Sequence, residues 1–230
     1  MRDFAELIMT LDETTKTNVR VEAMAEYFRA AEDKDKVWTI ALLSGRRPKR
    51  AINTNYIREW ASELAGIPLW LFEDSYHVVG DLAETIALVL PEADKSSKKS
   101  LSDWIESIIK IRSTDLADKK EFLIKSWSEL SKEDRFVFNK LLTGGFRIGV
   151  SQKLMTRALS KASGIEENTL ALRLMGNWNP ETIDFKKLVI EADTNEDLSK
   201  PYPFYLAYAI EKEPESLGKP EEWYAERKWD

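Results

Sequence analysis

Residues 42–67, LLSGRRPKRAINTNYIREWASELAGI, and residues 141–165, LLTGGFRIGVSQKLMTRALSKASGI, follow one plan in two places. Each stretch opens with two leucines and a turn of small residues, continues with basic residues, and closes with a helix-length segment before Gly-Ile. Gly66 and Gly164 stand where helices commonly end, because glycine adopts the left-handed conformation of that position without strain. The two stretches predict a helical unit that occurs twice in the chain.

Two further matches keep the same order along the chain. Residues 79–81 (VGD) correspond to residues 175–177 (MGN), and residues 84–86 (ETI) correspond to residues 181–183 (ETI). The alternative explanation is chance similarity between amphipathic helices. Against it, the separate matches share nearly one offset, so we interpret them as a duplication.

The matches place repeat one at about residues 3–91 and repeat two at about residues 101–192, joined by the polar linker EADKSSKKS at residues 92–100. Two copies are too few for a solenoid, so we expect them to pack face to face about a pseudo-twofold axis. We expect residues 1–195 to form one domain and residues 196–230 to begin another.

Apolar residues recur with helical spacing in nearly every long segment. In residues 21–31 they fall at i, i+3, i+4, i+7 and i+10, and residues 119–130 carry a similar stripe. Strand signals are almost absent. The same helical spacing occurs in residues 101–113, 132–142, 151–163 and 180–190. The sequence therefore predicts an all-α fold of about a dozen helices.

The composition of the 230 residues excludes several classes of protein. No Cys is present, which excludes disulfide scaffolds, thiolate metal sites and cysteine nucleophiles. The single His, His77, argues against His-rich zinc sites and Ser-His-Asp triads, and we expect it to be structural. No apolar run approaches the roughly 18 residues of a membrane span, and the first residues lack a signal-peptide layout. We therefore expect a soluble, cytoplasmic protein.

The net charge of −6 at pH 7 is unevenly distributed. Residues 196–230 hold nine acids and five bases, so they carry −4 of that charge. Residues 44–58 hold five bases and no acid, and residues 140–157 hold four bases and no acid. Because these two segments are equivalent in the two repeats, each repeat has one basic edge.

Both basic segments predict a helix end, a small-residue turn and a new helix that begins at an N-cap, Asn53 or Ser151. A helix N-terminus offers free N–H groups and partial positive charge, which suit a phosphate, and glycine lets the backbone come close. One such turn would be an ordinary solvated connection. Two at matching positions, both without acids, favour phosphate binding, one site for each strand of a duplex. We expect contacts with the DNA backbone rather than readout of base sequence.

The chain ends in ERKWD at residues 226–230, which resembles the start of the E-x-K-x-D-G adenylation motif of nucleotidyltransferases, cut before its glycine. This short match follows two helical repeats with phosphate-like turns, of which LTGGFRIGV at residues 142–150 is the most specific. Taken together, the chain resembles the N-terminal DNA-binding region of the ATP-dependent DNA ligases found in bacteria. Its first turn, at residues 46–50, is more basic and poorer in glycine than the family pattern.

The resemblance implies an all-helical, pseudo-symmetric domain that holds nicked double-stranded DNA mainly through the minor groove. In the parent ligase, Lys228 would attack the α-phosphate of ATP to form lysyl-AMP, Glu226 would read adenine, and Mg²⁺ would assist sealing. Residues 196–230 would be the connector and first strand of a nucleotidyltransferase domain missing from this chain, so the chain alone is expected to be inactive. The predicted DNA contacts are Gly45, Arg46, Arg47, Lys49, Arg50, Asn53, Thr143, Gly144, Gly145, Arg147, Gly149, Ser151, Gln152 and Lys153.

Aromatic and lysine side chains outside the turns are expected to be structural or solvated. Trp178 lies on a turn and is the one candidate for stacking on a base. The tryptophans expected in the core or at helix interfaces are Trp38, Trp60, Trp104 and Trp127. The linker lysines, expected to be solvated, are Lys95, Lys98 and Lys99.

We expect the protein to be a monomer of the bacterial cytoplasm, associated with the nucleoid and serving DNA replication, repair or recombination. The competing hypothesis is a helical protein-interaction domain with no DNA role. It would expose an apolar patch and scatter the basic residues over the surface. The basic residues that distinguish the two hypotheses are Arg46, Arg47, Lys49, Arg147 and Lys153.

Overall fold

A computed structural model of the chain describes residues 1–93, 97–144, 146, 149–191 and 219. By compactness the chain divides into two units, Met1–Lys200 and Pro201–Asp230. Apart from Lys219, the second unit lies outside the described residues.

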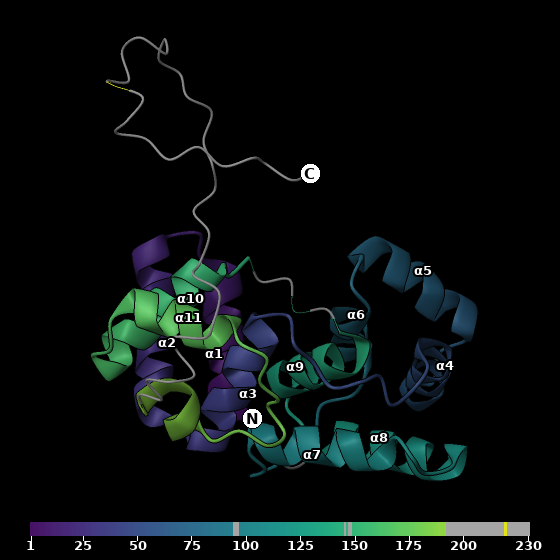
Figure 1. The fold of residues 1–230 in the computed structure, drawn as a ribbon. Helices are drawn as coiled ribbons and strands as arrows, with labels where there is room; N and C mark the ends of the chain where they lie inside the picture. Colours follow the sequence, from purple (N-terminus) through teal and green to yellow (C-terminus); the bar gives the residue numbers. More distant parts are fainter. Residues whose placement is uncertain (94–96, 145, 147–148, 192–218, 220–230) are drawn as a thin grey trace. The chain divides into compact units, whose positions relative to one another are not determined.

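Helices account for all regular structure in the described residues, which contain no strand and confirm the predicted all-α class (Figure 1). Eleven of these elements are α-helices and one, η1, is a π-helix. Their bounds are α1 Arg2–Glu13, α2 Thr17–Ala30, α3 Asp33–Leu43, α4 Thr54–Ala65, α5 Leu69–Val79, α6 Leu82–Val89, α7 Leu101–Ile111, α8 Leu116–Glu129, α9 Lys132–Thr143, α10 Gln152–Ser163, α11 Glu167–Met175 and η1 Lys186–Ile190.

One hydrophobic core runs through both repeats. In α2 the predicted apolar stripe faces this core: Val21, Met24, Ala25 and Phe28 are all buried. The tryptophans expected in the interior are confirmed there, namely Trp38, Trp60, Trp104 and Trp127. Burial of apolar side chains is therefore what holds helices from the two repeats together.

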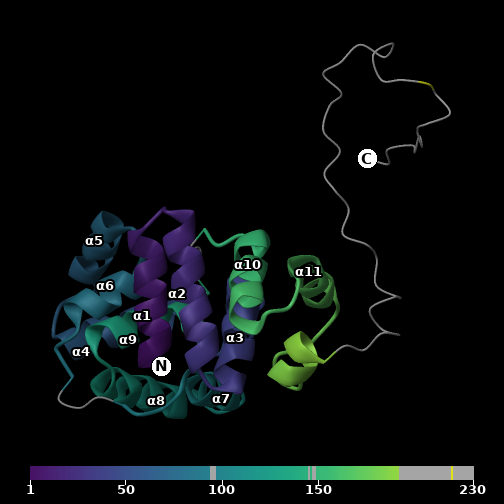
Figure 2. The same cartoon turned by 90° about the vertical axis from the view of Figure 1, so that its left-hand side faces the viewer.

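Helices of each repeat pack on helices of the other repeat. α1 and α2 of the first repeat pack on α9 and α10 of the second, while α7 and α8 of the second pack on α3 and α4 of the first. In both views α4, α5 and α6 lie at one end of the unit, and α10 and α11 lie at the other (Figures 1 and 2). Reciprocal contacts of this kind are what a pseudo-twofold axis between the repeats predicts.

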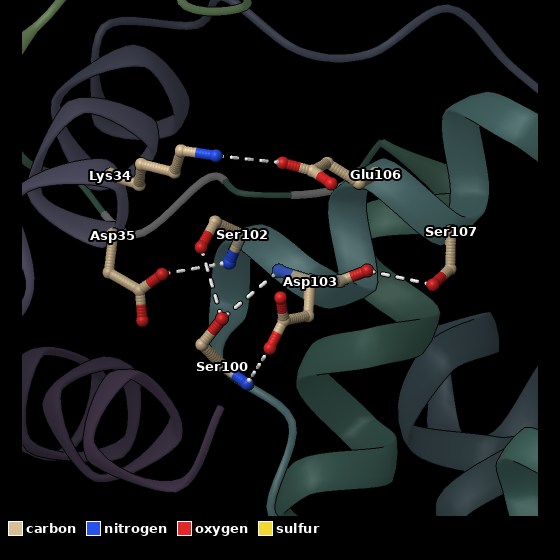
Figure 3. Close-up of polar contacts among 7 residues, drawn as sticks. All are labelled: Lys34, Asp35, Ser100, Ser102, Asp103, Glu106 and Ser107. Carbon is tan, nitrogen blue, oxygen red and sulfur yellow. Dashed lines mark hydrogen bonds and ion pairs between the residues drawn. The ribbon is translucent and has the colours of Figure 1, made fainter.

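An aspartate in α3 caps the first helix of the second repeat (Figure 3). Asp35 is buried, and its two carboxylate oxygens accept hydrogen bonds from the N–H groups of Leu101 at 3.1 Å and Ser102 at 2.8 Å. α7 also has a capping box, in which Ser100 and Asp103 each accept from the other's backbone N–H. The first N–H groups of α7 are thus satisfied partly from within the helix and partly from the other repeat.

The equivalent aspartate of the second repeat, Asp134, lies close to the start of α1. Asp35 and Asp134 are each the third residue of their helix. The N-terminal ammonium and Arg2 are the positive charges near Asp134, and burial raises the pKa of its carboxyl above the ordinary value. The same residue type therefore meets the first helix of the opposite repeat in both halves.

The second repeat departs from the first after α11. Residues 180–190 were expected to be helical, but only Lys186–Ile190 is, as the π-helix η1. Pro180 lacks an N–H, and the Asn179 side chain accepts from the N–H of Glu181 at 3.0 Å, which sets a turn. The expected helix is therefore wrong over its first half, where α6 of the first repeat is regular.

Candidate nucleic-acid interface

The first predicted turn is a helix stop with a left-handed glycine. Gly45 follows the end of α3 and has φ +78°. Its N–H donates to Leu42 O at 3.1 Å, and the N–H of Arg46 donates to Ala41 O at 2.8 Å. This pair of bonds is a Schellman motif, which satisfies the last carbonyls of the helix. The turn therefore fixes the direction in which the chain continues into the basic residues.

The second predicted turn also begins with a left-handed glycine. Gly144 has φ +84° and its N–H donates to Lys140 O at 2.8 Å. The ring of Phe146 lies 5.9 Å from that of Phe4 in α1, which anchors the turn on the opposite repeat. Gly149 is again left-handed, with φ +63°. Gly145 and Arg147, both predicted contacts, lie outside the described residues.

The two turns meet. The Arg47 guanidinium Nη1 donates to Gly144 O at 2.8 Å, so a side chain of turn one bonds the backbone of turn two. Both turns line a single shallow cavity of about 260 Å³. Its lining is Arg47, Pro48, Lys49, Arg50, Leu141, Leu142, Thr143 and Gly144. Five predicted DNA contacts are thereby brought together, drawn from segments that lie far apart in the sequence.

The helices that follow the turns start at the predicted caps. The Asn53 side chain accepts from the N–H of Asn55 at 3.0 Å, and the Ser151 hydroxyl accepts from the N–H of Leu154 at 3.2 Å. In the described part of the chain, the N–H groups of Gln152 and Lys153 have no acceptor. Both residues are exposed, so the start of α10 offers open donors and the positive end of a helix dipole to an anion.

Not every basic residue near the turns is free. Arg58 pairs with Glu73 at 3.1 Å, and Lys140 pairs with Asp81, so acids from elsewhere in the fold neutralise part of each acid-free segment. Within the two acid-free segments, the exposed basic residues that have no ion pair in the described part of the chain are Arg47, Lys49, Arg50, Lys153 and Arg157. These five keep a net positive charge on the surface beside the two turns.

A family model for the DNA ligase N terminus matches residues 1–160. The chain belongs to this family. A comparison with curated protein sequences finds no match. The matched residues include both turns and the start of α10, and they confirm the resemblance to the N-terminal region of an ATP-dependent DNA ligase.

In this DNA ligase N terminus, the side chain of Arg46 does not line the cavity that its neighbours line. Its guanidinium is partly buried and bonded to backbone carbonyls near the end of α11. Trp178 lies beneath it and is only 8% exposed, so the expectation that its ring is available to a base is wrong. Trp178 belongs to a turn, as expected, but Arg46 of the first repeat covers its ring.

Sequence reasoning missed Arg20. This α2 residue donates from Nη1 to Gly149 O at 3.2 Å and from Nε to Thr14 O, so it ties the second turn to the first repeat. Residues 14–21, TTKTNVRV, also contain no acid, which is the signal that could have drawn attention to it.

The predicted ATP-binding residues of the ligase, Glu226 and Lys228, lie outside the described residues. Across the helices that the structure describes, none is long and apolar enough to cross a membrane.

Proposed function

We propose that this chain binds double-stranded DNA without sequence preference, holding the phosphates through its two turns. The observation that carries the proposal is the hydrogen bond from Arg47 to Gly144 O, which joins the two repeat-related turns. Basic side chains that have no ion pair in the described residues line the same cavity. Left-handed glycines, open N–H groups and exposed Arg and Lys are the chemistry of phosphate contacts. Membership of the DNA ligase family supports DNA as the partner.

The preferred ligand that we propose is nicked duplex, gripped through the minor groove by a monomer. In the parent ligase, Lys228 would be adenylated by ATP and Glu226 would read adenine. Mg²⁺ would stabilise negative charge on the transferring phosphates. The parent would act in DNA replication, repair or recombination in a bacterial cytoplasm, at the nucleoid.

Fluorescence anisotropy against salt tests the DNA proposal. Each phosphate contact contributes about −0.9 to the slope of log K against log salt, so several contacts should weaken binding at least roughly tenfold between 50 and 200 mM salt. Arg50→Ala should make the slope shallower by about 0.9. Arg112→Ala, an exposed arginine at the end of α7, is the matched control and should leave it unchanged.

The outcomes distinguish the proposals from their alternatives. A flat salt response would overturn DNA binding, and affinity for one sequence only would overturn backbone readout. Equal affinity for nicked and intact duplex would remove the preference for nicks.

Mass spectrometry after incubation with ATP and Mg²⁺ should show one AMP on the intact ligase, none on its Lys228→Ala variant and none on this 230-residue chain.

A second candidate function, protein interaction, rests on α5. Leu69, Trp70, Leu71 and Val78 are exposed there, with Trp70 at 65% and Val78 at 87%. Exposed apolar patches mark sites of association. Trp70→Glu should leave DNA affinity unchanged if the two functions occupy separate surfaces, and a loss of DNA affinity would show that α5 belongs to the DNA surface.

A further inference from the structure

The side chain of Arg46 leaves the turn-one cavity and reaches into the second repeat. Nη1 donates to Trp178 O at 2.8 Å, and Nη2 donates to Gly176 O at 2.9 Å and Leu174 O at 3.4 Å. The guanidinium carbon lies 4.3 Å from the centre of the Trp178 ring. One side chain therefore makes three hydrogen bonds and a cation–π contact with a single short segment.

That segment runs from the last turn of α11 to Trp178, and its carbonyls need hydrogen-bond donors. α11 ends at Met175, and the last carbonyls of a helix lack intrahelical donors. A positive charge is favourable at this end of the helix dipole. The Trp178 indole N–H also donates to Leu174 O, at 3.0 Å, so the platform beneath Arg46 is itself fixed. A planar guanidinium presents a fork of N–H donors along its edges while its face stacks on a ring, an arrangement that the compact ammonium of lysine does not reproduce.

Residue 46 is thus held twice, since its N–H is part of the Schellman motif and its side chain binds carbonyls at and just beyond the end of α11. The next residue, Arg47, starts from this fixed point and ends on Gly144 O. Pro48, which follows, is buried. The path of turn one is therefore determined on both sides of Arg47.

We infer that Arg46 is a positioning residue, which clamps turn one to the end of α11 so that Arg47, Lys49 and Arg50 meet the phosphates, while Arg46 itself contacts none. The inference rests on the proposed function. Trp178 is the second half of the clamp.

Salt dependence separates positioning from contact. Arg46→Ala should weaken DNA binding by roughly threefold to thirtyfold, because freed side chains must be ordered again on binding. The slope of log K against log salt should stay that of the unaltered chain, whereas loss of a phosphate contact would make it shallower by about 0.9. Arg46→Gln, which removes the charge but keeps an N–H donor group, gives the same reading should Arg46→Ala fail to fold.

Two further variants sharpen the test. Arg46→Lys keeps the charge but loses the planar fork of donors that reaches three carbonyls, so it should weaken binding nearly as much as Arg46→Ala does. Trp178→Leu should reproduce the effect, and the double variant Arg46→Ala/Trp178→Leu should be no weaker than either single one, because both break one unit. Circular dichroism establishes that each variant retains its helices.

Full affinity in Arg46→Lys, a shallower slope in Arg46→Gln, or additive losses in the double variant would each overturn the clamp while leaving DNA binding in place. Absence of DNA binding by the unaltered chain would instead overturn the proposed function and the inference together. The two failures are therefore distinguishable in one set of titrations.

Discussion

Two aspartates at the same position of two equivalent helices lie in different surroundings. Asp35 accepts two backbone N–H groups from α7. Asp134 is 3% exposed, and desolvation raises the pKa of its carboxyl despite the nearby N-terminal ammonium, the Ser131 hydroxyl and Arg2. Glu133 adds to the increase. Desolvation therefore disfavours the ionised form of Asp134 in the folded protein.

Asp134→Asn should accordingly stabilise the protein at neutral pH. Because the folded state raises the pKa of this acid, the stability that the protonated form contributes is fully present below the ordinary pKa, about 3.9, and is lost as the pH rises through the folded value. Urea unfolding at several pH values should show the variant ahead at pH 7 and level with the parent near pH 3. Glu26→Gln, an exposed residue of α2, is the control. A variant that is less stable at pH 7 would contradict this account.

Gly149 is needed for its backbone conformation. A valine at φ +63° would be strained by at least about 1–2 kcal/mol, although the nearest atom to its Cβ, Arg20 Nη1, is 3.6 Å away and leaves room. Gly149→Val should weaken DNA binding with little loss of helix content by circular dichroism. Unfolding of the variant would mean that the glycine serves packing instead.

Gly164→Val is a matched control for that prediction. Gly164 has φ +75° and open space around it, and it lies at the opposite end of α10 from Gly149. The strain is similar in kind, so stability should fall to a similar extent. DNA affinity should be retained, since this end of the helix is far from the turns.

At the scale of elements, the start of α7 depends on a helix of the other repeat. Asp35→Ala removes the acceptor of two N–H groups, which should lower the free energy of unfolding by about 1–3 kcal/mol. Chemical denaturation measures this directly. Glu26→Ala, a surface change in α2, should remain within about 0.5 kcal/mol of the parent. Equal effects of the two substitutions would show that the capping box alone is sufficient for α7.

Elements were predictable from sequence where their signals are local. Asn53 and Ser151 cap the helices expected of them, and Gly66 and Gly164 are the left-handed stops. These features depend on a few neighbouring residues. The helix expected over 180–190 failed for the same kind of reason, because Pro180 and Asn179 together favour a turn that apolar spacing does not register.

The candidate site was predictable only in part. That the two turns carry related chemistry follows from the repeat, and their meeting at Arg47 agrees with it. The roles of Arg46 and Arg20 could not be predicted, since their partners, such as Trp178 and Gly149, are more than a hundred positions away in the chain. A basic residue in a turn looks the same in sequence whether it faces solvent or a distant carbonyl.

At the scale of the molecule, the packing of each repeat on the other predicts that neither repeat folds alone. A cut within the linker at residues 92–100 should give two fragments that each lack a cooperative thermal transition, because α2 and α10, and likewise α4 and α8, would be separated. Mixing them should restore the transition and helix content in a concentration-dependent way. Cooperative unfolding of the first fragment on its own, followed by circular dichroism, would refute this.

The repeat predicted a pseudo-twofold relation, but the equivalence of helices does not by itself determine which helix of one repeat packs on which helix of the other.

The packing of each repeat on the other also determines how long a nascent helix waits for its partner. α2 is complete at Ala30, but its partner α10 is complete only at Ser163. Translation adds about 5–20 residues per second, so roughly 7–27 seconds separate the two events. Until α10 follows, the face of α2 that packs on it in the folded protein lacks this partner. This delay during synthesis is a consequence of the topology itself.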